Sequence, residues 1–484
     1  MSRPNANPES AVYRCPTEIW EQILITLVYS SRTHPVYNQH VMPLSRGGHA
    51  RYSFHFSFDE VYQPHTTAWR DWCEDVRFKV EPTSIVTLNS LDWSYRLVCR
   101  AWSRFLLPFL LDTIRIHRNY TELDEVLAML GTNGGSQLRG HYVRCLLVQI
   151  GYLQDWDIKE PDTAIATATM AKLFKRCPKL EELRYIDDVI LPSPDLTMSV
   201  CSNLQRIALS WSTSIDAASF LDFCASLPSL YLLDLSRHNA DTSRPGNTRN
   251  SFRWHLGTLT HLVLRLDSSW MRHITACALP RLQHLYALVS SLEEPQDGGE
   301  HAEHFFHLNG AKLRSIVFAH TTVPTRNDLE LVVLELCPNV EEYTTCFPFI
   351  HSDTPFPVLA QLRSLGLSGF GLDEQAAQVL GLSDIGIAGL PEATLAFFSK
   401  LNRVNTPSLA VIKALDLESH KARDTAWTKT ISAVTEICQA RGIRFQDALE
   451  RPVFLPSVHT ANPVSFLASG FTSRPAPSRF PSHG

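Results

Sequence analysis

Three histidines offer the first candidate chemistry in this chain, because His301, His304 and His307 lie three residues apart. On a helix this spacing brings the side chains close together, and imidazole nitrogens are common ligands of transition metals. No fourth ligand stands at a spacing typical of a zinc site, and the preceding segment is acidic and rich in glycine. The pattern therefore favours the exposed face of a surface helix over a metal site.

Other short motifs could support catalysis or phosphate binding, but each lacks a residue that the chemistry requires. The sequence Gly366-Leu367-Ser368-Gly369 is similar to a hydrolase nucleophile elbow without the full G-x-S-x-G pattern. The glycine-rich segment 131–135 has no phosphate-loop lysine after it. Carboxylate pairs at 187–188 and 341–342 are most simply solvated. We therefore expect no catalytic, cofactor-binding or metal-binding residues, and a protein that is not an enzyme.

The composition is typical of a globular protein and gives no basic excess for nucleic acid. Hydrophobic residues make up 44% and charged residues 19%, and the formal net charge is -5. The 11 cysteines form no C-x-x-C pair and mostly stand in apolar contexts, which favours reduced core residues of an intracellular protein. No signal peptide is evident, and no apolar run approaches the roughly 20 residues that span a bilayer. We expect no membrane partner and a cytoplasmic or nuclear location.

A hexapeptide pattern, L-x-x-L-x-L with conservative replacements, recurs along most of the chain. From Leu180 to Leu362 the steps between matches are 24, 26, 29, 23, 31, 27 and 22 residues. These values centre on the roughly 20–29 residues of leucine-rich repeats, and a dozen near-regular matches exceed chance. The hexapeptides begin at Leu111, Val143, Leu180, Leu204, Leu230, Leu259, Leu282, Leu313, Val340, Leu362, Leu382 and Ile412.

Strand and helix signals alternate through this array. Within each hexapeptide the leucines should enter the core while the intervening residues face out. The segments between hexapeptides have helical spacing, as at 216–227, 327–337 and 391–401, and Asp216 is placed as an N-cap. The pattern predicts an α/β fold over residues 111–450, with a curved parallel sheet, outer helices and an irregular solenoid form.

The ends of the array and its loops can also be assigned. A long helix over 424–440 and the segment 442–445 should close the last repeat, because an open end exposes core. Longer loops are expected at 239–251 and 293–303.

Two segments near the N-terminus predict short amphipathic helices. The first covers 15–28 and begins P-x-E-I-W-x-x-I; the second covers 97–108 and contains L-V-C-R-x-W before a proline. Together they resemble the F-box, the module that docks substrate receptors onto a Skp-type adaptor. The positions that match as docking residues are Pro16, Ile19, Ile23, Leu24, Leu97, Val98 and Trp102.

The resemblance extends to the repeats, where phrases such as Cys177-Pro178 are followed by a leucine two residues later. This arrangement is similar to fungal F-box proteins with degenerate leucine-rich repeats, and it covers residues 15–445. It implies a non-enzymatic substrate receptor that joins a cullin-type ubiquitin ligase through the adaptor. The solenoid would then hold an unknown target protein.

One departure from the F-box pattern is the long insertion at 29–91, where the family has a short connection. Tyr52, Phe54, Phe56 and Phe58 alternate with polar residues, which is typical of a strand, and the insertion is expected either to form a local hairpin or to pack on the helices. The expected organisation is a disordered start at 1–12, an F-box-like module at 13–110, the solenoid at 111–450 and a disordered tail at 451–484.

Outward positions of successive strands should line up into one partner-binding surface. Aromatic residues near these positions, namely Trp211, Tyr231, Trp270 and Tyr286, suit a protein interface. The candidate partner-binding residues are Arg206, His261, His284, Arg314 and Arg363.

Two alternatives to the ligase receptor stay open. The chain could be a leucine-rich-repeat scaffold whose F-box-like helices only cap the array. An enzyme on a repeat fold would need a catalytic dyad or metal ligands on the concave face, and the sequence offers neither.

Overall fold

The chain divides into two compact units, Met1–Val453 and Phe454–Gly484, and all described residues belong to the first. The computed structural model describes residues 111–116, 120–131, 139–148, 163–185, 201–210, 216–237, 253–266, 268, 270–289, 298–320, 333–346, 356–368, 386–415, 425–447 and 453. The F-box-like segments, their seven docking positions and the 29–91 insertion lie outside these residues and stay predictions. Of the tail expected from 451, only Val453 is described, and its backbone N–H donates to the Phe445 carbonyl (3.1 Å).

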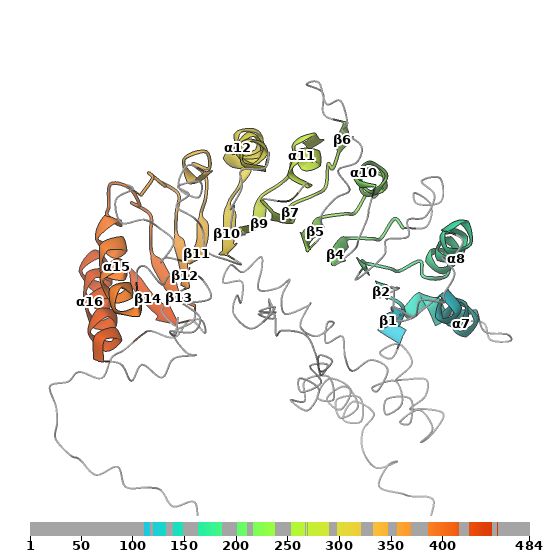
Figure 1. The fold of residues 1–484 in the computed structure, drawn as a ribbon, viewed down its shortest axis with the longest axis horizontal. Helices are drawn as coiled ribbons and strands as arrows, with labels where there is room; N and C mark the ends of the chain where they lie inside the picture. The colour runs from blue at the N-terminus through green and yellow to red at the C-terminus, as the bar shows by residue number, and fades with distance from the viewer. Residues whose placement is uncertain are drawn as a thin grey trace, which may run out of the picture. The chain divides into compact units, whose positions relative to one another are not determined.

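Twelve strands form one parallel sheet in which neighbours in the sheet follow one another along the chain. Figure 1 shows these strands along an arc, with the helices on its outer side. The expected α/β fold with a long parallel sheet is therefore confirmed. The strands are β1 Thr113–Ile116, β2 Cys145–Val148, β3 Glu182–Tyr185, β4 Arg206–Ser210, β5 Leu232–Arg237, β7 His261–Arg265, β9 His284–Val289, β10 Ser315–His320, β11 Glu342–Cys346, β12 Ser364–Ser368, β13 Val411–Ala414 and β14 Arg444–Asp447.

Helices connect the strands in most of the repeats, as the alternation of sequence signals predicts. Each repeat, a strand together with the segment before it, is called a unit below. Asp216 caps its helix as expected, because its carboxylate accepts from the backbone N–H groups of Ala218 and Ser219. At the last helix, Gly442 adopts a φ of 72°, a left-handed conformation that ends the helix before the final strand. The helices are α7 Tyr120–Leu130, α8 Thr163–Arg176, α10 Ala217–Ala225, α11 Trp270–Thr275, α12 Gly298–Asn309, α15 Gly386–Lys400 and α16 Thr425–Arg441, with short 3-10 helices at Arg139–Tyr142 and Gly310–Lys312.

The core lies between the sheet and the helices and is built from the leucine positions of the hexapeptides. On β5 both Leu233 and Leu235 are fully buried, and Leu233 pairs in register with Ile207 on one side and Leu262 on the other. The same positions are buried on the ten strands of this sheet from β1 to β12. Each unit therefore contributes one layer to a continuous apolar core.

A tight turn precedes each strand and fixes where the strand begins. In the unit of β10, the Leu313 N–H donates to the Gly310 carbonyl three residues earlier (3.0 Å). The side chain just before the first apolar position then ties one unit to the previous one: Asn339 Nδ2 donates to the Ala311 carbonyl (2.7 Å), and Asn203 makes the equivalent bond. Carbonyls of the turns thus find hydrogen-bond partners in the neighbouring unit.

Two predicted hexapeptides are wrong. The match that begins at Leu382 ends in a helix and not in a strand, because α15 starts at Gly386. This start is five residues before that of the helix expected at 391–401. The final match has the wrong register: Ile412 pairs with Leu365, so Leu409 and not Ile412 takes the first apolar position. Leu409 is buried, as a residue at the first apolar position is in the other units.

Other local expectations are corrected or extended. The loop expected over 293–303 is shorter, because α12 begins at Gly298. Of the helix expected over 327–337, residues 333–335 are described as helical. A second, two-stranded sheet pairs β6 (Trp254–His255) with β8 (Cys277–Ala278), and two-residue strands leave no detectable alternation in sequence. Within the described residues no helix is long and apolar enough to cross a membrane.

Candidate partner-binding surface

The five residues expected to bind a partner lie at or just before the first strand residue in five units. Arg206, His261 and His284 begin β4, β7 and β9, each two residues after the first apolar position of its hexapeptide. Arg314 and Arg363 stand one residue earlier in their units, just before β10 and β12. Because strand side chains alternate, the three strand residues project from the sheet face opposite the core leucines.

A series of side-chain contacts crosses four neighbouring strands. It leads from Arg206 to Tyr231, then to His261 and finally to His284. The Arg206 Nε donates to the Tyr231 hydroxyl (2.5 Å), and its guanidinium lies 5.6 Å from the Tyr231 ring centre. The Tyr231 ring meets His261 edge-on at 5.8 Å, and His261 stacks on His284 at 4.3 Å with 22° between the ring planes. These contacts hold the polar groups in fixed positions, which lowers the entropy that a partner must remove on binding.

Further along the sheet, Arg314 and Arg363 share one carboxylate. Arg314 Nη1 forms an ion pair with Glu341 Oε1, and Arg363 Nη1 lies 3.6 Å from Glu341 Oε2. The arginine side chains are 59% and 67% exposed, so solvent screens both pairs and they contribute little to folding. Both guanidinium groups therefore remain accessible to another anion. We call Arg206, Tyr231, His261, His284, Arg314 and Arg363 the binding stripe.

Several neighbours of the stripe are buried, contrary to the expected polar and aromatic surface. Trp270 and Tyr286 are fully buried, so neither can serve as an exposed aromatic contact, and Trp211 lies outside the described residues. Ser315 was expected to face out, yet it is 1% exposed. Alternate positions on the central strands are likewise apolar and buried: Leu232, Val263 and Val317. On these central strands the accessible polar side chains of the stripe therefore lie at the strand starts.

The paired histidines are neutral at physiological pH. Burial, together with the charges of His284 and Arg206, lowers the pKa of His261 from 6.5 to about 3. Burial and the charge of Arg314 lower the pKa of His284 from 6.5 to about 4. A neutral imidazole can donate and accept one hydrogen bond each, which suits recognition of a peptide amide.

This shift predicts that acid destabilises the fold through the stacked pair. In the unfolded chain both histidines protonate below about pH 6.5, whereas the folded protein keeps them neutral until their lowered pKa values are reached. The folded state should therefore have its full stability above about pH 6.5, the pKa of the unfolded histidines. The free energy of unfolding should fall as pH decreases toward 4, by roughly 1 kcal/mol per imidazole at about pH 5.5. Denaturant unfolding at about pH 7.5 and 5.5 measures the fall, and the double variant His261→Gln/His284→Gln should reduce it. An equal fall in both proteins would contradict the assignment.

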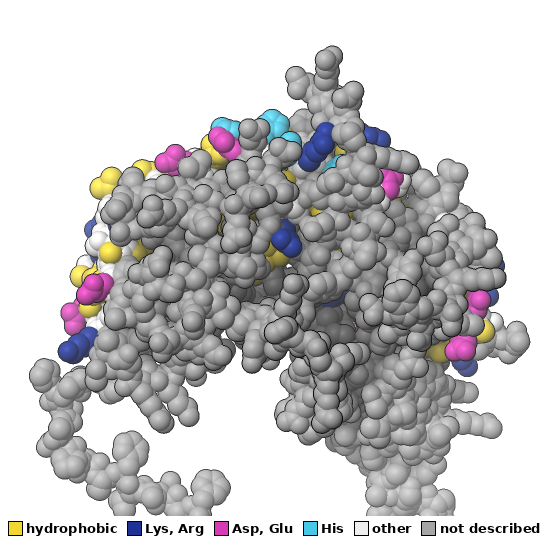
Figure 2. Space-filling model, in the orientation of Figure 1, with side chains coloured by type: hydrophobic (Ala, Val, Ile, Leu, Met, Phe, Trp, Pro, Cys, Tyr) yellow, Lys and Arg dark blue, Asp and Glu magenta, His cyan; other side chains and the backbone are white. Residues whose placement is uncertain are grey.

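The three histidines at 301, 304 and 307 lie on α12, as the spacing predicted. His304 and His307 are exposed, and Figure 2 shows histidine side chains on the outer surface over this helix. His307 Nε2 lies 3.5 Å from Glu303 Oε1, one helical turn earlier. No group of three metal-binding side chains occurs among the residues that the structure describes.

The remaining motifs belong to the architecture of the sheet. Gly366 and Ser368 are part of β12, and a side chain at Gly366 would come within 2.6 Å of the Thr344 hydroxyl on the neighbouring strand. This glycine is thus explained by packing between strands. Glu341 and Glu342 stand at the start of β11, whereas 187–188 lies outside the described residues, as does 132–135.

The fold and the stripe define a class of protein. It is an α/β protein with a long parallel sheet and helices, an arrangement compatible with a curved solenoid. The chain matches no protein-family model and no curated protein sequence at a significant level.

Proposed function

We propose that this protein is the substrate-recognition subunit of a cullin-type ubiquitin ligase, with an F-box at its N-terminus and an irregular leucine-rich-repeat solenoid. The observation that carries the proposal is the binding stripe, in which successive units place polar side chains at the same end of one sheet. Repeat arrays use such aligned positions to bind extended protein surfaces. The F-box resemblance of 15–28 and 97–108 supports attachment to a Skp-type adaptor.

In this proposal the protein contributes proximity rather than chemistry. The adaptor would connect the N-terminal helices to the ligase core, and the solenoid would hold a client protein. Holding the client raises the local concentration of its lysines near the conjugating enzyme. The scaffold alternative differs in one respect only, since it requires client binding without the adaptor.

The test separates adaptor binding from client binding in the same cells. Removing residues 1–110, or introducing Ile19→Asp/Leu97→Asp into the full chain, should abolish recovery of the Skp-type adaptor in affinity purification with mass spectrometry. The triple change Arg206→Ala/His261→Ala/Arg314→Ala should instead deplete clients and leave the adaptor. Wild-type protein that recovers clients but no adaptor would support the scaffold alternative and reject the ligase assignment.

A further inference from the structure

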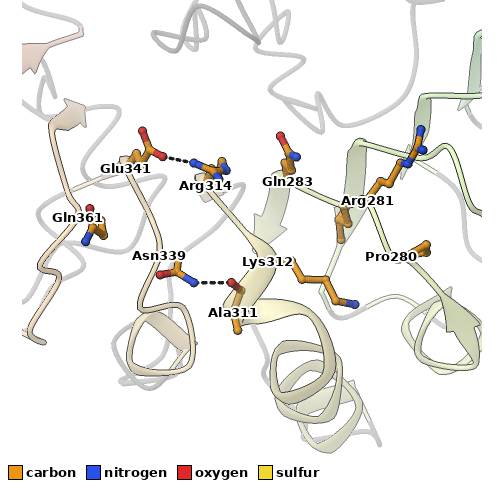
Figure 3. A pocket seen from close by; sticks show the side chains of 10 residues that line it. Pro280, Arg281, Gln283, Ala311, Lys312, Arg314, Asn339, Glu341 and Gln361 are labelled. Atoms are coloured by element: carbon orange, nitrogen blue, oxygen red, sulfur yellow. Dashed lines mark hydrogen bonds and ion pairs between the residues drawn. The ribbon is translucent and has the colours of Figure 1, made fainter.

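A cleft of about 340 Å³ opens at the N-terminal ends of β9, β10, β11 and β12 (Figure 3). Its volume is within the range of ligand-binding pockets. The lining residues flank the first apolar position in successive units, so the repeat itself builds the cleft. Its charged and glutamine side chains are Arg281, Gln283, Lys312, Arg314, Glu341 and Gln361.

The cleft has an excess of positive charge in a protein whose formal net charge is -5. Three of its side chains are cationic, namely Arg281, Lys312 and Arg314, and Glu341 is its one carboxylate. Glu341 is already shared between Arg314 and Arg363. Lys312 Nζ donates to two neutral oxygens, the Leu279 carbonyl (3.2 Å) and Asn309 Oδ1 (3.1 Å).

No carboxylate of the described residues pairs with Arg281 or Lys312. Both side chains are exposed, so a ligand can reach them without any change in the fold. Gln283 and Gln361 are exposed as well and stand on opposite walls of the cleft, and their amides can donate to and accept from a peptide backbone. The cleft therefore offers two exposed cations that pair with no carboxylate of the described residues, beside amide groups suited to an extended chain.

We propose that this cleft binds an acidic segment of the client protein, with Arg281 and Lys312 pairing with carboxylates of that segment. Arg314 belongs to both the cleft and the binding stripe, so one extended peptide can occupy both. One cation of the cleft, Arg314, already pairs with a carboxylate, that of Glu341 (Figure 3). That the bound segment belongs to a client protein rests on the proposed function, whereas the binding of an acidic peptide by the cleft does not.

The test uses full-length protein and fluorescence polarisation of a labelled oligoglutamate peptide, with oligoglutamine as the uncharged comparison. The variant Arg281→Glu/Gln361→Glu reverses the charge of the cleft without touching a described hydrogen bond or ion pair. It should weaken oligoglutamate binding about tenfold or more. The matched control, Arg403→Glu/Gln439→Glu, makes the same charge change at exposed positions outside the cleft and should leave the affinity nearly unchanged.

Three results would overturn the inference. These are no binding of oligoglutamate to wild-type protein, an equal loss in the cleft and control variants, and displacement of the peptide by equimolar inorganic phosphate, which would indicate a phosphate site. The proposed function fails separately: protein that binds oligoglutamate through the cleft but never recovers the adaptor is an acidic-peptide receptor outside the ligase. A cleft variant that still recovers every client would confine the inference to the peptide and reject its role in client recognition.

Discussion

Leu233→Asp is expected to unfold the middle of the parallel sheet. The side chain is fully buried, and its register partners on the adjacent strands are Ile207 and Leu262, which are also fully buried. An aspartate there would have no cation or donor within the apolar layer, and an unpaired buried charge costs several kcal/mol. The loss of the leucine adds about 2–5 kcal/mol for the unfilled volume. Neighbouring units should unfold with it, because each is stabilised mainly by its neighbours.

Circular dichroism during heating measures this effect as a large fall in the unfolding midpoint or loss of the folded baseline. Gln283→Asp is the matched control, since it places the same carboxylate at an exposed position just before β9. Its unfolding midpoint should stay close to that of the wild type. If Leu233→Asp has an unchanged midpoint, the register of β4, β5 and β7 given above is incorrect.

Gly140→Ala should destabilise the protein nearly as clearly, although it adds a single methyl group. A Cβ at Gly140 would lie 1.9 Å from the carbonyl oxygen of Arg176 in the next unit, well inside van der Waals contact. Gly310 occupies the same place in its own unit and would meet the Leu336 carbonyl at 2.4 Å. Backbone cannot swing aside as a side chain can, so the two units must separate. We expect a loss of about 2 kcal/mol or more for either alanine variant, measured by denaturant unfolding.

Gly257→Ala provides the comparison, because the atom nearest to its added methyl group belongs to the exposed His255 side chain. That imidazole can rotate away, so the free energy of unfolding should change by a few tenths of a kcal/mol at most. Equal losses at Gly140 and Gly257 would mean that the backbone contact between units does not set the cost.

The sequence alone determined the repeating layer of this protein. Ten of the twelve predicted hexapeptides coincide with strands, because leucines two and three residues apart have only one way to bury themselves against the preceding layer. Asp216 was predictable as a helix cap because its carboxylate acts on its own next turn. The same register placed Arg206, His261 and His284 on the outward face of their strands, since outward positions follow directly from inward ones, whereas their role in partner binding stays a prediction.

Only the tertiary structure decided the features that depend on pairing between units. Both Leu409-x-x-Ile412-x-Ala414 and Ile412-x-x-Leu415-x-Leu417 fit the hexapeptide pattern, and the pairing of Ile412 with Leu365 on β12 selects Leu409 as the first core position. The burial of Tyr286 and Ser315 also escaped the sequence, since alternation tells which face a side chain takes and not whether that face meets water. The cleft arises in the same way: Arg281 is far from Lys312 and Arg314 in the chain and comes near them only because parallel strands bring equivalent turn residues side by side.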